Sequence, residues 1–301
     1  MLPIKLELPE EFYQEETRTG YTISREMKEV WAVELDLLNE FIRVCQKLGL
    51  KYSLEGGSML GAVREGKFIP WDDDIDVTML RHDYDILMKE GPKYFKSPYF
   101  LQSAYTDKEY SRRHAQLRNE QTCAMLANEA QTVRFNQGIF LDIFVLDGVD
   151  MQREEEELNT ALSLFKHCNY ISYHHSTNRI IELIKKIRAK VISLIEGDIP
   201  TSLKRMEEYM RQFQNEEIVA ELCIKETVPT IKHFQREWFE NLTTIEFEGI
   251  TCTIPAEYDK ALTVWFGKDY MVPRNIPTMH GMQGGMIFDA HKSYKQVLEE
   301  M

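Results

Sequence analysis

Hydrophobic side chains recur at intervals of three or four residues between Ser24 and Leu48, and this spacing predicts one long amphipathic helix. Gly49 follows the last apolar residue as a stop signal. Segment 1–22 has no such period, and we expect an irregular N-terminal arm there. The apolar residues that define the helix are Met27, Val30, Trp31, Leu35, Leu38, Phe41, Ile42, Cys45 and Leu48.

The next hundred residues alternate short apolar segments with polar breaks. Helices are expected at Ser58–Val63 and at Tyr84–Glu90, the second capped by Asp83. The run Ile139–Leu146 predicts a buried strand with a single acid, Asp142, inside it. The other predicted strands are Tyr52–Leu54, Ile75–Leu80, Tyr99–Tyr105 and His114–Thr122.

Charged helical stretches replace the strands over about 151–220. A strand pattern returns at Thr244–Ile254, before helices at Glu257–Phe266 and Ala290–Glu300. Because helices and strands mix without a regular βαβ alternation, we expect an α+β fold. We treat 1–301 as a single domain, and its parts are a core at 24–150, a helical insertion at 151–235 and a C-terminal portion at 236–301 that packs on the core.

The net charge of −13 narrows the range of partners. Nucleic-acid-binding proteins usually carry a basic face, so this charge argues against nucleic acid as the main partner. Five widely spaced cysteines without a CxxC pair indicate reduced thiols rather than disulfides or a zinc site. The N-terminus lacks the pattern of a signal peptide, and no apolar run is long enough for a transmembrane helix. These features predict a cytoplasmic protein.

Four carboxylates lie within five residues, at Asp72, Asp73, Asp74 and Asp76. In a strand, Asp72, Asp74 and Asp76 would share one face, where they repel one another unless a cation lies between them. Oxygen ligands of this kind suit Mg²⁺ or Mn²⁺. An acidic surface turn is the alternative, but the apolar flanks at 69–71 and 75–80 favour a metal site. An EF-hand is rejected because Val77 occupies the position of its glycine.

Upstream of the acids, Gly56-Gly57-Ser58 follows a predicted strand and opens a predicted helix. Glycines let a backbone approach phosphate closely, and a helix N-terminus offers N–H donors. Such a segment is more often a simple turn, but the acids downstream strengthen the phosphate interpretation. Arg64 and Lys67 lie between the two motifs as candidate phosphate ligands or as surface charges.

Asp142 is a second candidate metal ligand. A lone acid in an apolar run is costly to bury unless it is paired or binds a cation. The acidic cluster upstream favours the ligand interpretation. Asp147, at the end of the same run, is expected to be a turn residue.

The segments EGGSMLGAVR at 55–64 and FIPWDDDIDV at 68–77 resemble the LicD family of phosphocholine transferases. That family is similar to the fukutin-type phosphosugar transferases, and both resemble the polymerase β-like nucleotidyltransferase fold. The resemblance is strongest over about 52–86. It continues more loosely through 138–148 and 255–271, and about 150–235 show little that matches.

The resemblance implies a mixed sheet flanked by helices, with helical additions, and it implies roles for individual residues. Gly57 and Ser58 would contact the nucleotide phosphate. Asp74 and Asp76 would form the Asp-x-Asp metal pair, with Asp72 as an additional acid or as the alternative partner of Asp76. The third carboxylate, on a neighbouring strand, would be Asp142. The last candidate, His280, falls where the family tends to carry a C-terminal histidine, as a general acid or phosphate ligand or as a surface residue.

The reaction that the resemblance implies is transfer of phosphocholine from CDP-choline to a sugar hydroxyl of a glycan, with CMP released. Asp142 would draw the proton from the hydroxyl. CDP-ribitol and CDP-glycerol are alternative donors. A choline head group would need an aromatic cage, for which Phe68, Trp71, Tyr105 and Trp265 are available. The rival functions are nucleotidyl transfer with pyrophosphate release and a non-catalytic nucleotide-binding regulator.

The stretch Arg179–Ile195 predicts an amphipathic helix that contains four further basic residues, Lys185, Lys186, Arg188 and Lys190. Such a helix could rest on the inner face of a membrane, near a lipid-linked glycan acceptor. The alternative, which we favour from sequence, is an ordinary packed helix.

Overall fold

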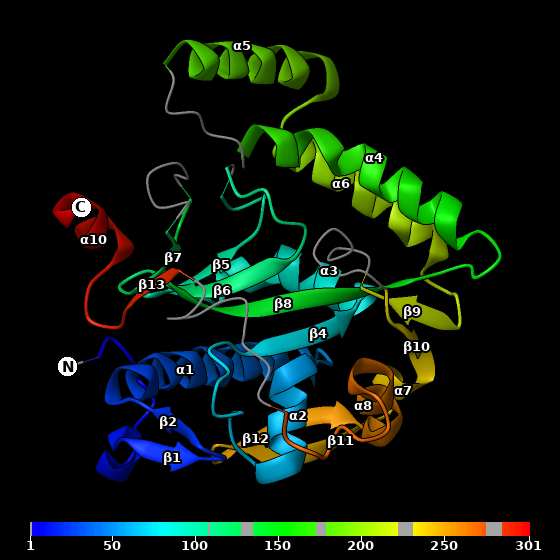
Figure 1. The fold of residues 1–301 in the computed structure, drawn as a ribbon. Coiled ribbons are helices and arrows are strands. Elements are labelled where there is room, and N and C mark those ends of the chain that lie inside the picture. Colours follow the sequence, from blue (N-terminus) through cyan, green and yellow to red (C-terminus); the bar gives the residue numbers. More distant parts are fainter. Residues whose placement is uncertain (1, 108, 128–134, 173–178, 222–230, 275–284) are drawn as a thin grey trace.

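A seven-stranded mixed sheet forms the centre of the molecule, and strand β8 (Ile139–Gly148) runs through its middle (Figure 1). The computed structural model describes residues 2–107, 109–127, 135–172, 179–221, 231–274 and 285–301. β8 pairs in parallel with β4 (Asp76–Leu80) on one side and antiparallel with β6 (Ala115–Asn119) on the other. Strands that are buried on both faces have continuous apolar sequences, which is why the apolar run 139–146 predicted this strand. The remaining strands of the sheet are β3 (Ser53–Leu54), β5 (Tyr99–Gln102), β9 (Ile218–Ala220) and β10 (His233–Gln235).

Helix α1 (Arg25–Leu48) ends where predicted, begins one residue after the predicted Ser24, and packs against β8 and β6. The Ser24 side chain accepts the Met27 N–H, and Gly49 takes a left-handed conformation with φ +68° at the other end. The fully buried ring of Trp31 lies on the helix face that meets the core. The helical period therefore predicted both the extent of α1 and its buried side.

The N-terminal arm is more regular than predicted. It contains a 3-10 turn, η1 (Glu10–Tyr13), and a hairpin of β1 (Glu16–Arg18) and β2 (Tyr21–Ile23). The turn residues Thr19 and Gly20 both have positive φ, which matches the twist of a two-residue hairpin. The expectation of an irregular arm is therefore wrong for 16–23.

Several predicted boundaries move in the structure. Helix α2 (Gly56–Glu65) is longer than the predicted Ser58–Val63 and begins two residues earlier, at Gly56. Helix α3 (Arg81–Glu90) begins at Arg81, and Asp83 lies in its first turn instead of capping it. The predicted strands at 99–105 and 114–122 are shorter, as β5 and β6. A short 3-10 helix, η2 (Gly91–Lys93), lies between α3 and β5.

The segment predicted as a helical insertion contains helices α4 (Glu154–Ser172), α5 (Arg179–Glu196) and α6 (Ile199–Met210), followed by η3 (Arg211–Phe213). It also supplies β9 and β10 to the central sheet. Helices α4 and α6 pack together on the side of the sheet opposite α1, and α5 lies beyond them (Figure 1). The preferred expectation of a packed helix at 179–195 is wrong, because the apolar side chains of α5 are largely exposed.

A buried cluster of three charged side chains, Arg81, Asp147 and Glu207, ties this insertion to the sheet. Arg81, at the start of α3, donates two hydrogen bonds of 2.7 Å to the carboxylate of Asp147 in β8. Glu207 of α6 lies 3.4 Å from the same guanidinium. Asp147 is therefore a buried structural residue within a strand, and its prediction as a turn residue is wrong.

The C-terminal portion packs beside α2 and β3. Its predicted strand segment at 244–254 is a hairpin of β11 (Leu242–Phe247) and β12 (Ile250–Pro255), between helices α7 (Arg236–Glu240) and α8 (Tyr258–Phe266). Strand β13 (Met286–Asp289) pairs with β7 (Cys123–Leu126), and the last helix is α10 (Tyr294–Glu300). The architecture is thus the expected mixed sheet flanked by helices. Within the described residues, no helix is both long and apolar enough to cross a bilayer.

Candidate active site

Three of the predicted acids lie in the loop between α2 and β4. The prediction that Asp72, Asp74 and Asp76 alternate along one strand is wrong, because β4 begins only at Asp76. The backbone of Asp72 is held instead by Trp31, whose indole N–H donates to its carbonyl oxygen at 2.9 Å. The loop still gathers the side chains, since carboxylate oxygens of Asp72, Asp73 and Asp74 lie within 4.8 Å of one another.

Asp76 and Asp142 are direct neighbours in the sheet. They occupy paired positions of the parallel strands β4 and β8, and the Asp142 N–H donates to the carbonyl of Ile75 at 3.0 Å. Side chains at paired positions of adjacent strands share a face. The lone acid of the apolar run therefore lies beside the last acid of the Asp-rich loop.

The electrostatics show how closely these carboxylates interact. Burial, followed by the charges of Asp74, Asp142 and Asp72, raises the pKa of Asp76 well above its usual range. Burial together with Asp74 and Asp73 does the same to the pKa of Asp72. Closely spaced buried carboxylates are stable only when protonated or neutralised by a cation. An all-oxygen donor set of this kind fits Mg²⁺ or Mn²⁺.

Two buried glutamates that the sequence did not single out adjoin the acids. Glu34, on α1, is 1% exposed, and burial with the charges of Asp74 and Asp73 raises its pKa. Glu55, just before α2, is buried too, and its charge contributes to the raised pKa of Asp76. The signal for Glu34 was its place on the apolar face of α1, three residues after Trp31.

The N-terminus of α2 lies against this acidic cluster. A Cβ added at Gly57 would be 2.2 Å from a carboxylate oxygen of Asp72, so any larger residue there would displace this carboxylate. The Ser58 hydroxyl accepts the backbone N–H of Asp76 at 2.9 Å and so fixes the start of β4. The first N–H groups of a helix have no intrahelical acceptor, and in α2 they adjoin the acids. The N–H groups would hold a phosphate, and the carboxylates beside them would hold its cation.

His114 and Gln116 hold Asp142 from the other side. The Gln116 side-chain amide donates to its carboxylate at 2.6 Å, and His114 Nε2 lies 3.1 Å from the same oxygen. Burial acts to raise the pKa of Asp142, but His114, Arg112 and Gln116 lower it below its usual value. Asp142 is therefore held as a carboxylate. The sequence signal for these two residues was their alternation with the apolar Ala115, which places both on one face of a strand.

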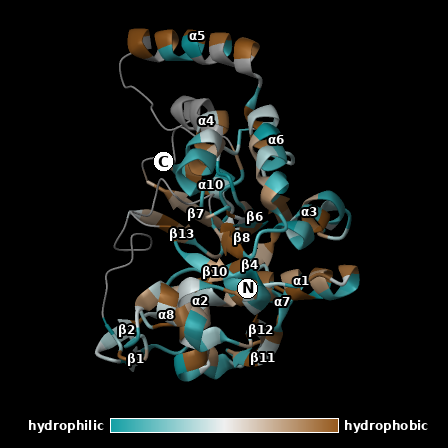
Figure 2. Cartoon of the chain, turned by 90° about the vertical axis from the view of Figure 1, so that its right-hand side faces the viewer, coloured by the Kyte–Doolittle hydropathy of each residue, from teal (hydrophilic) through white to brown (hydrophobic). Residues whose placement is uncertain are grey.

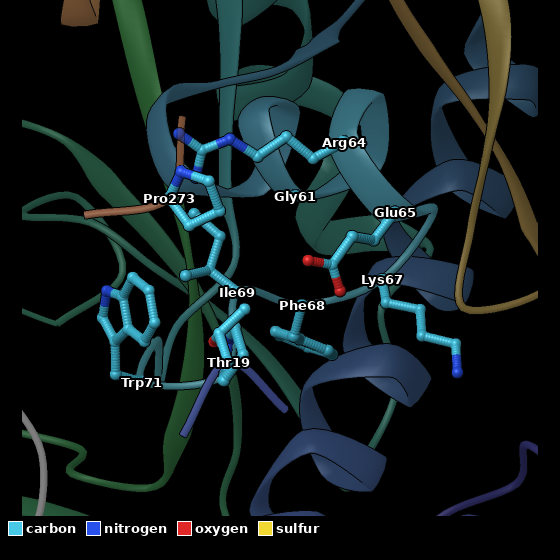
Figure 3. Close-up of a pocket in the computed structure, with 10 residues that line it drawn as sticks. Thr19, Gly61, Arg64, Glu65, Lys67, Phe68, Ile69, Trp71 and Pro273 are labelled. Atoms are coloured by element: carbon cyan, nitrogen blue, oxygen red, sulfur yellow. The ribbon is translucent and has the colours of Figure 1, made fainter. Parts of the chain in front are cut away.

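Arg64 and Lys67 lie at the far end of α2 from Gly57. Arg64 is in the last turn, about 10 Å along the axis at 1.5 Å per residue, and donates to the carbonyls of Tyr270 and Val272. Both residues line a pocket between α2 and the Asp-rich loop (Figure 3). The structure does not bring them to the acids, and His280 lies outside the described residues.

The four aromatic residues considered for a choline cage do not meet. Phe68 and Trp71 line the pocket of Figure 3. The hydroxyl of Tyr105 donates to Glu207 at 2.6 Å, and Trp265 lies on α8. Among the described residues, these four therefore do not form one cage.

Comparison with known proteins identifies the domain around this site. Residues 49–144 match the nucleotidyltransferase domain of the LicD, FKTN and FKRP proteins. Over 257 residues the chain is 26% identical to the lipopolysaccharide cholinephosphotransferase LicD of Haemophilus influenzae, which covers 81% of this chain and 91% of that protein. The chain therefore contains a LicD-type nucleotidyltransferase domain at residues 49–144.

A shorter similarity links the chain to ribitol 5-phosphate transferases. The FKRP proteins of Homo sapiens and Mus musculus are each 48% identical to it over 42 residues, which is 14% of this chain and 8% of theirs. The matched LicD domain extends from the end of α1 into β8. It thus contains both the N-terminus of α2 and the paired acids Asp76 and Asp142.

Proposed function

We propose that this protein transfers a phospho-alcohol group, phosphocholine from CDP-choline, to a sugar hydroxyl of a glycan and releases CMP. The observation that carries the proposal is the pair Asp76 and Asp142 on adjacent parallel strands, beside the N-terminus of α2. The relatives named above support the class of reaction, because each is named for transfer of a phospho-alcohol. A lipid-anchored glycan is the acceptor that the LicD relative's name favours.

Asp72, Asp74, Asp76 and Asp142 would hold Mg²⁺ or Mn²⁺. The donor set fits such an ion, because all four side chains offer carboxylate oxygens. When bound, the metal would neutralise charge on the phosphate oxygens. The side chain of Ser58 and the N–H groups at the start of α2 would then fix the orientation of the diphosphate.

In the proposed step, the acceptor hydroxyl attacks the phosphorus that carries choline. The bond from that phosphorus to the bridging oxygen breaks, and CMP leaves with this oxygen. Asp142, kept ionised by His114 and Gln116, takes the proton of the hydroxyl. Arg64, Lys67 and His280 remain predicted substrate-binding residues outside this step.

We also infer that the sheet is a polymerase β-like nucleotidyltransferase fold. The support is the placement of the acids at matching positions of β4 and β8, next to a glycine-led helix. The description of the matched domain as a nucleotidyltransferase keeps one rival open, the transfer of a nucleotide with pyrophosphate release.

The test is mass spectrometry of products from purified protein, Mg²⁺, one CDP-alcohol and a panel of sugars. We expect CMP and a phosphocholine-modified sugar from CDP-choline, and neither from Asp76→Asn. Glu217→Gln, on an exposed residue, is the matched control and should remain active. Consumption of CDP-ribitol or CDP-glycerol alone would replace choline as the donor group. Pyrophosphate from a nucleoside triphosphate would favour the rival reaction, and nucleotide binding without turnover would favour a regulator.

A further inference from the structure

Helix α5 exposes an apolar surface of a kind that soluble proteins normally bury. Eight of its apolar side chains are 46% to 79% exposed. They are Ile180, Ile181, Leu183, Ile184, Ile187, Val191, Leu194 and Ile195. Only seven other large hydrophobic residues are exposed in the rest of the described chain, and they are scattered over several elements. Contiguous apolar surface of this kind marks an interaction site.

The exposed residues form one stripe along the helix. Ile180, Ile184, Ile187, Val191 and Leu194 follow one another at intervals of three or four residues, the period of a helix face. Figure 2 shows α5 with hydrophobic turns along its length, set apart from the body of the protein beyond α4 and α6. Figure 1 shows the same separation from a second direction. The stripe is therefore accessible to a large flat partner.

Basic residues flank the stripe on both sides. At 100° per residue, Arg188 and Lys185 lie on one side of the apolar centre, and Lys190 and Lys186 lie on the other. The helix contains five basic and two acidic residues, although the whole chain has a net charge of −13. In an acidic protein, α5 is thus a locally basic segment that also exposes an apolar stripe.

We propose that α5 is an in-plane membrane anchor that binds the surface of an anionic lipid bilayer. An apolar stripe flanked by lysine and arginine is the arrangement by which interfacial helices insert among head groups. The stripe enters the acyl boundary while the flanking cations contact lipid phosphates. No described helix can cross a bilayer, so α5 lies along the surface and does not span it.

The charge distribution favours a bilayer over a second copy of the chain. Two copies paired through their α5 stripes would bring the flanking lysines and arginines together, and like charges at close range oppose association. An anionic bilayer surface instead attracts these lysines and arginines. This inference does not depend on the proposed transferase activity, since it uses neither the acidic cluster nor α2.

The test is flotation of the full chain with vesicles, compared between pure phosphatidylcholine and equal parts of phosphatidylcholine and phosphatidylglycerol. The protein should float with the anionic vesicles, and added salt should weaken its binding. The triple variant Ile184→Gln, Ile187→Gln, Val191→Gln should lower the partition coefficient by roughly tenfold or more. Replacement of Lys185, Lys186 and Lys190 by Gln should lower it by about fivefold for each charge.

Matched control variants remove positive charges or apolar side chains at exposed positions outside α5. Lys204→Gln, Lys260→Gln, Lys268→Gln removes three exposed charges outside α5 and should leave flotation unchanged. Met151→Gln, Met271→Gln does the same for exposed apolar side chains. Circular dichroism checks that each variant is folded. Equal loss of binding in the controls, or wild-type protein that does not float, overturns the proposal. A dimer in light scattering that the α5 apolar variant converts to monomer, with no vesicle binding, assigns the stripe to a second copy.

Discussion

The carboxylate of Asp72 lies against the Cα of Gly57, where a side chain at residue 57 would begin. A Cβ there would come within 2.2 Å of one Asp72 oxygen. The φ of Gly57 is not in the left-handed region, so the backbone itself would accept alanine. Glycine at this position therefore serves the close approach of an acid to a helix N-terminus, and not an unusual backbone conformation.

Gly57→Ala should abolish most of the activity without unfolding the protein. Alanine is the better helix former, which offsets part of the clash. The Asp72 carboxylate must move, and a displacement near 1 Å in a catalytic arrangement costs about 100-fold in rate. The measurement is the rate of CMP release alongside a thermal melt.

Gly20→Ala is a useful control for this variant. Gly20 has φ +76° in the β1–β2 turn, and no atom lies within 4 Å of an added Cβ. The substitution should cost about 1 kcal/mol of stability through backbone strain and leave the rate unchanged. A Gly57→Ala protein that is as active as this control would show that Asp72 is not needed where the structure places it.

Asp76→Asn should stabilise the metal-free protein and remove its response to Mg²⁺. Burial and the repulsion by neighbouring carboxylates raise the pKa of Asp76, and a neutral side chain relieves both, so we expect a gain on the order of 1 kcal/mol. Mg²⁺ should raise the melting temperature of the wild type by binding the native state, and should not shift the variant. Thermal melts in EDTA and in Mg²⁺ measure both effects. Glu217→Gln should behave as wild type, and an equal Mg²⁺ shift in Asp76→Asn would exclude Asp76 as a ligand.

What the sequence could predict depended on how local each signal was. The period of α1 and the stop at Gly49 are local, and the structure confirms them. The acids at 72–76 were found as a group because they interrupt apolar sequence, but their arrangement was predicted wrongly as a strand. The indole of Trp31, 41 residues away, holds the Asp72 carbonyl, and no local pattern shows such a contact. His114 was missed for the same reason, because the register of β6 on β8 brings it to Asp142.

Trp31→Phe tests that long-range contact. Phenylalanine keeps a ring to stack on Phe68, whose centroid lies 4.4 Å from that of Trp31, but it removes the N–H that Asp72 accepts. A partly buried carbonyl left without its donor costs about 1 kcal/mol, which urea unfolding will show. The loop should also become less well ordered, so we expect a rate loss of roughly tenfold. Trp265→Phe, on the partly exposed face of α8, should change neither quantity. Equal effects from the two variants would show that the Trp31 N–H does not hold the loop at Asp72.

Asp147→Ala should be among the most destabilising single substitutions in this protein. It leaves the Arg81 guanidinium, 2% exposed, without the carboxylate that takes two of its hydrogen bonds. Breaking a buried pair in this way costs about 3–5 kcal/mol. The double variant Arg81→Met, Asp147→Leu removes both charges and should recover most of that loss. Urea unfolding of the two single variants and the double variant completes a double-mutant cycle, which gives the interaction energy of the pair. Glu257→Ala, which breaks the exposed pair with Lys260, should cost under about 1 kcal/mol. If Asp147→Ala costs no more than that, the pair does not stabilise the packing of α3 on β8.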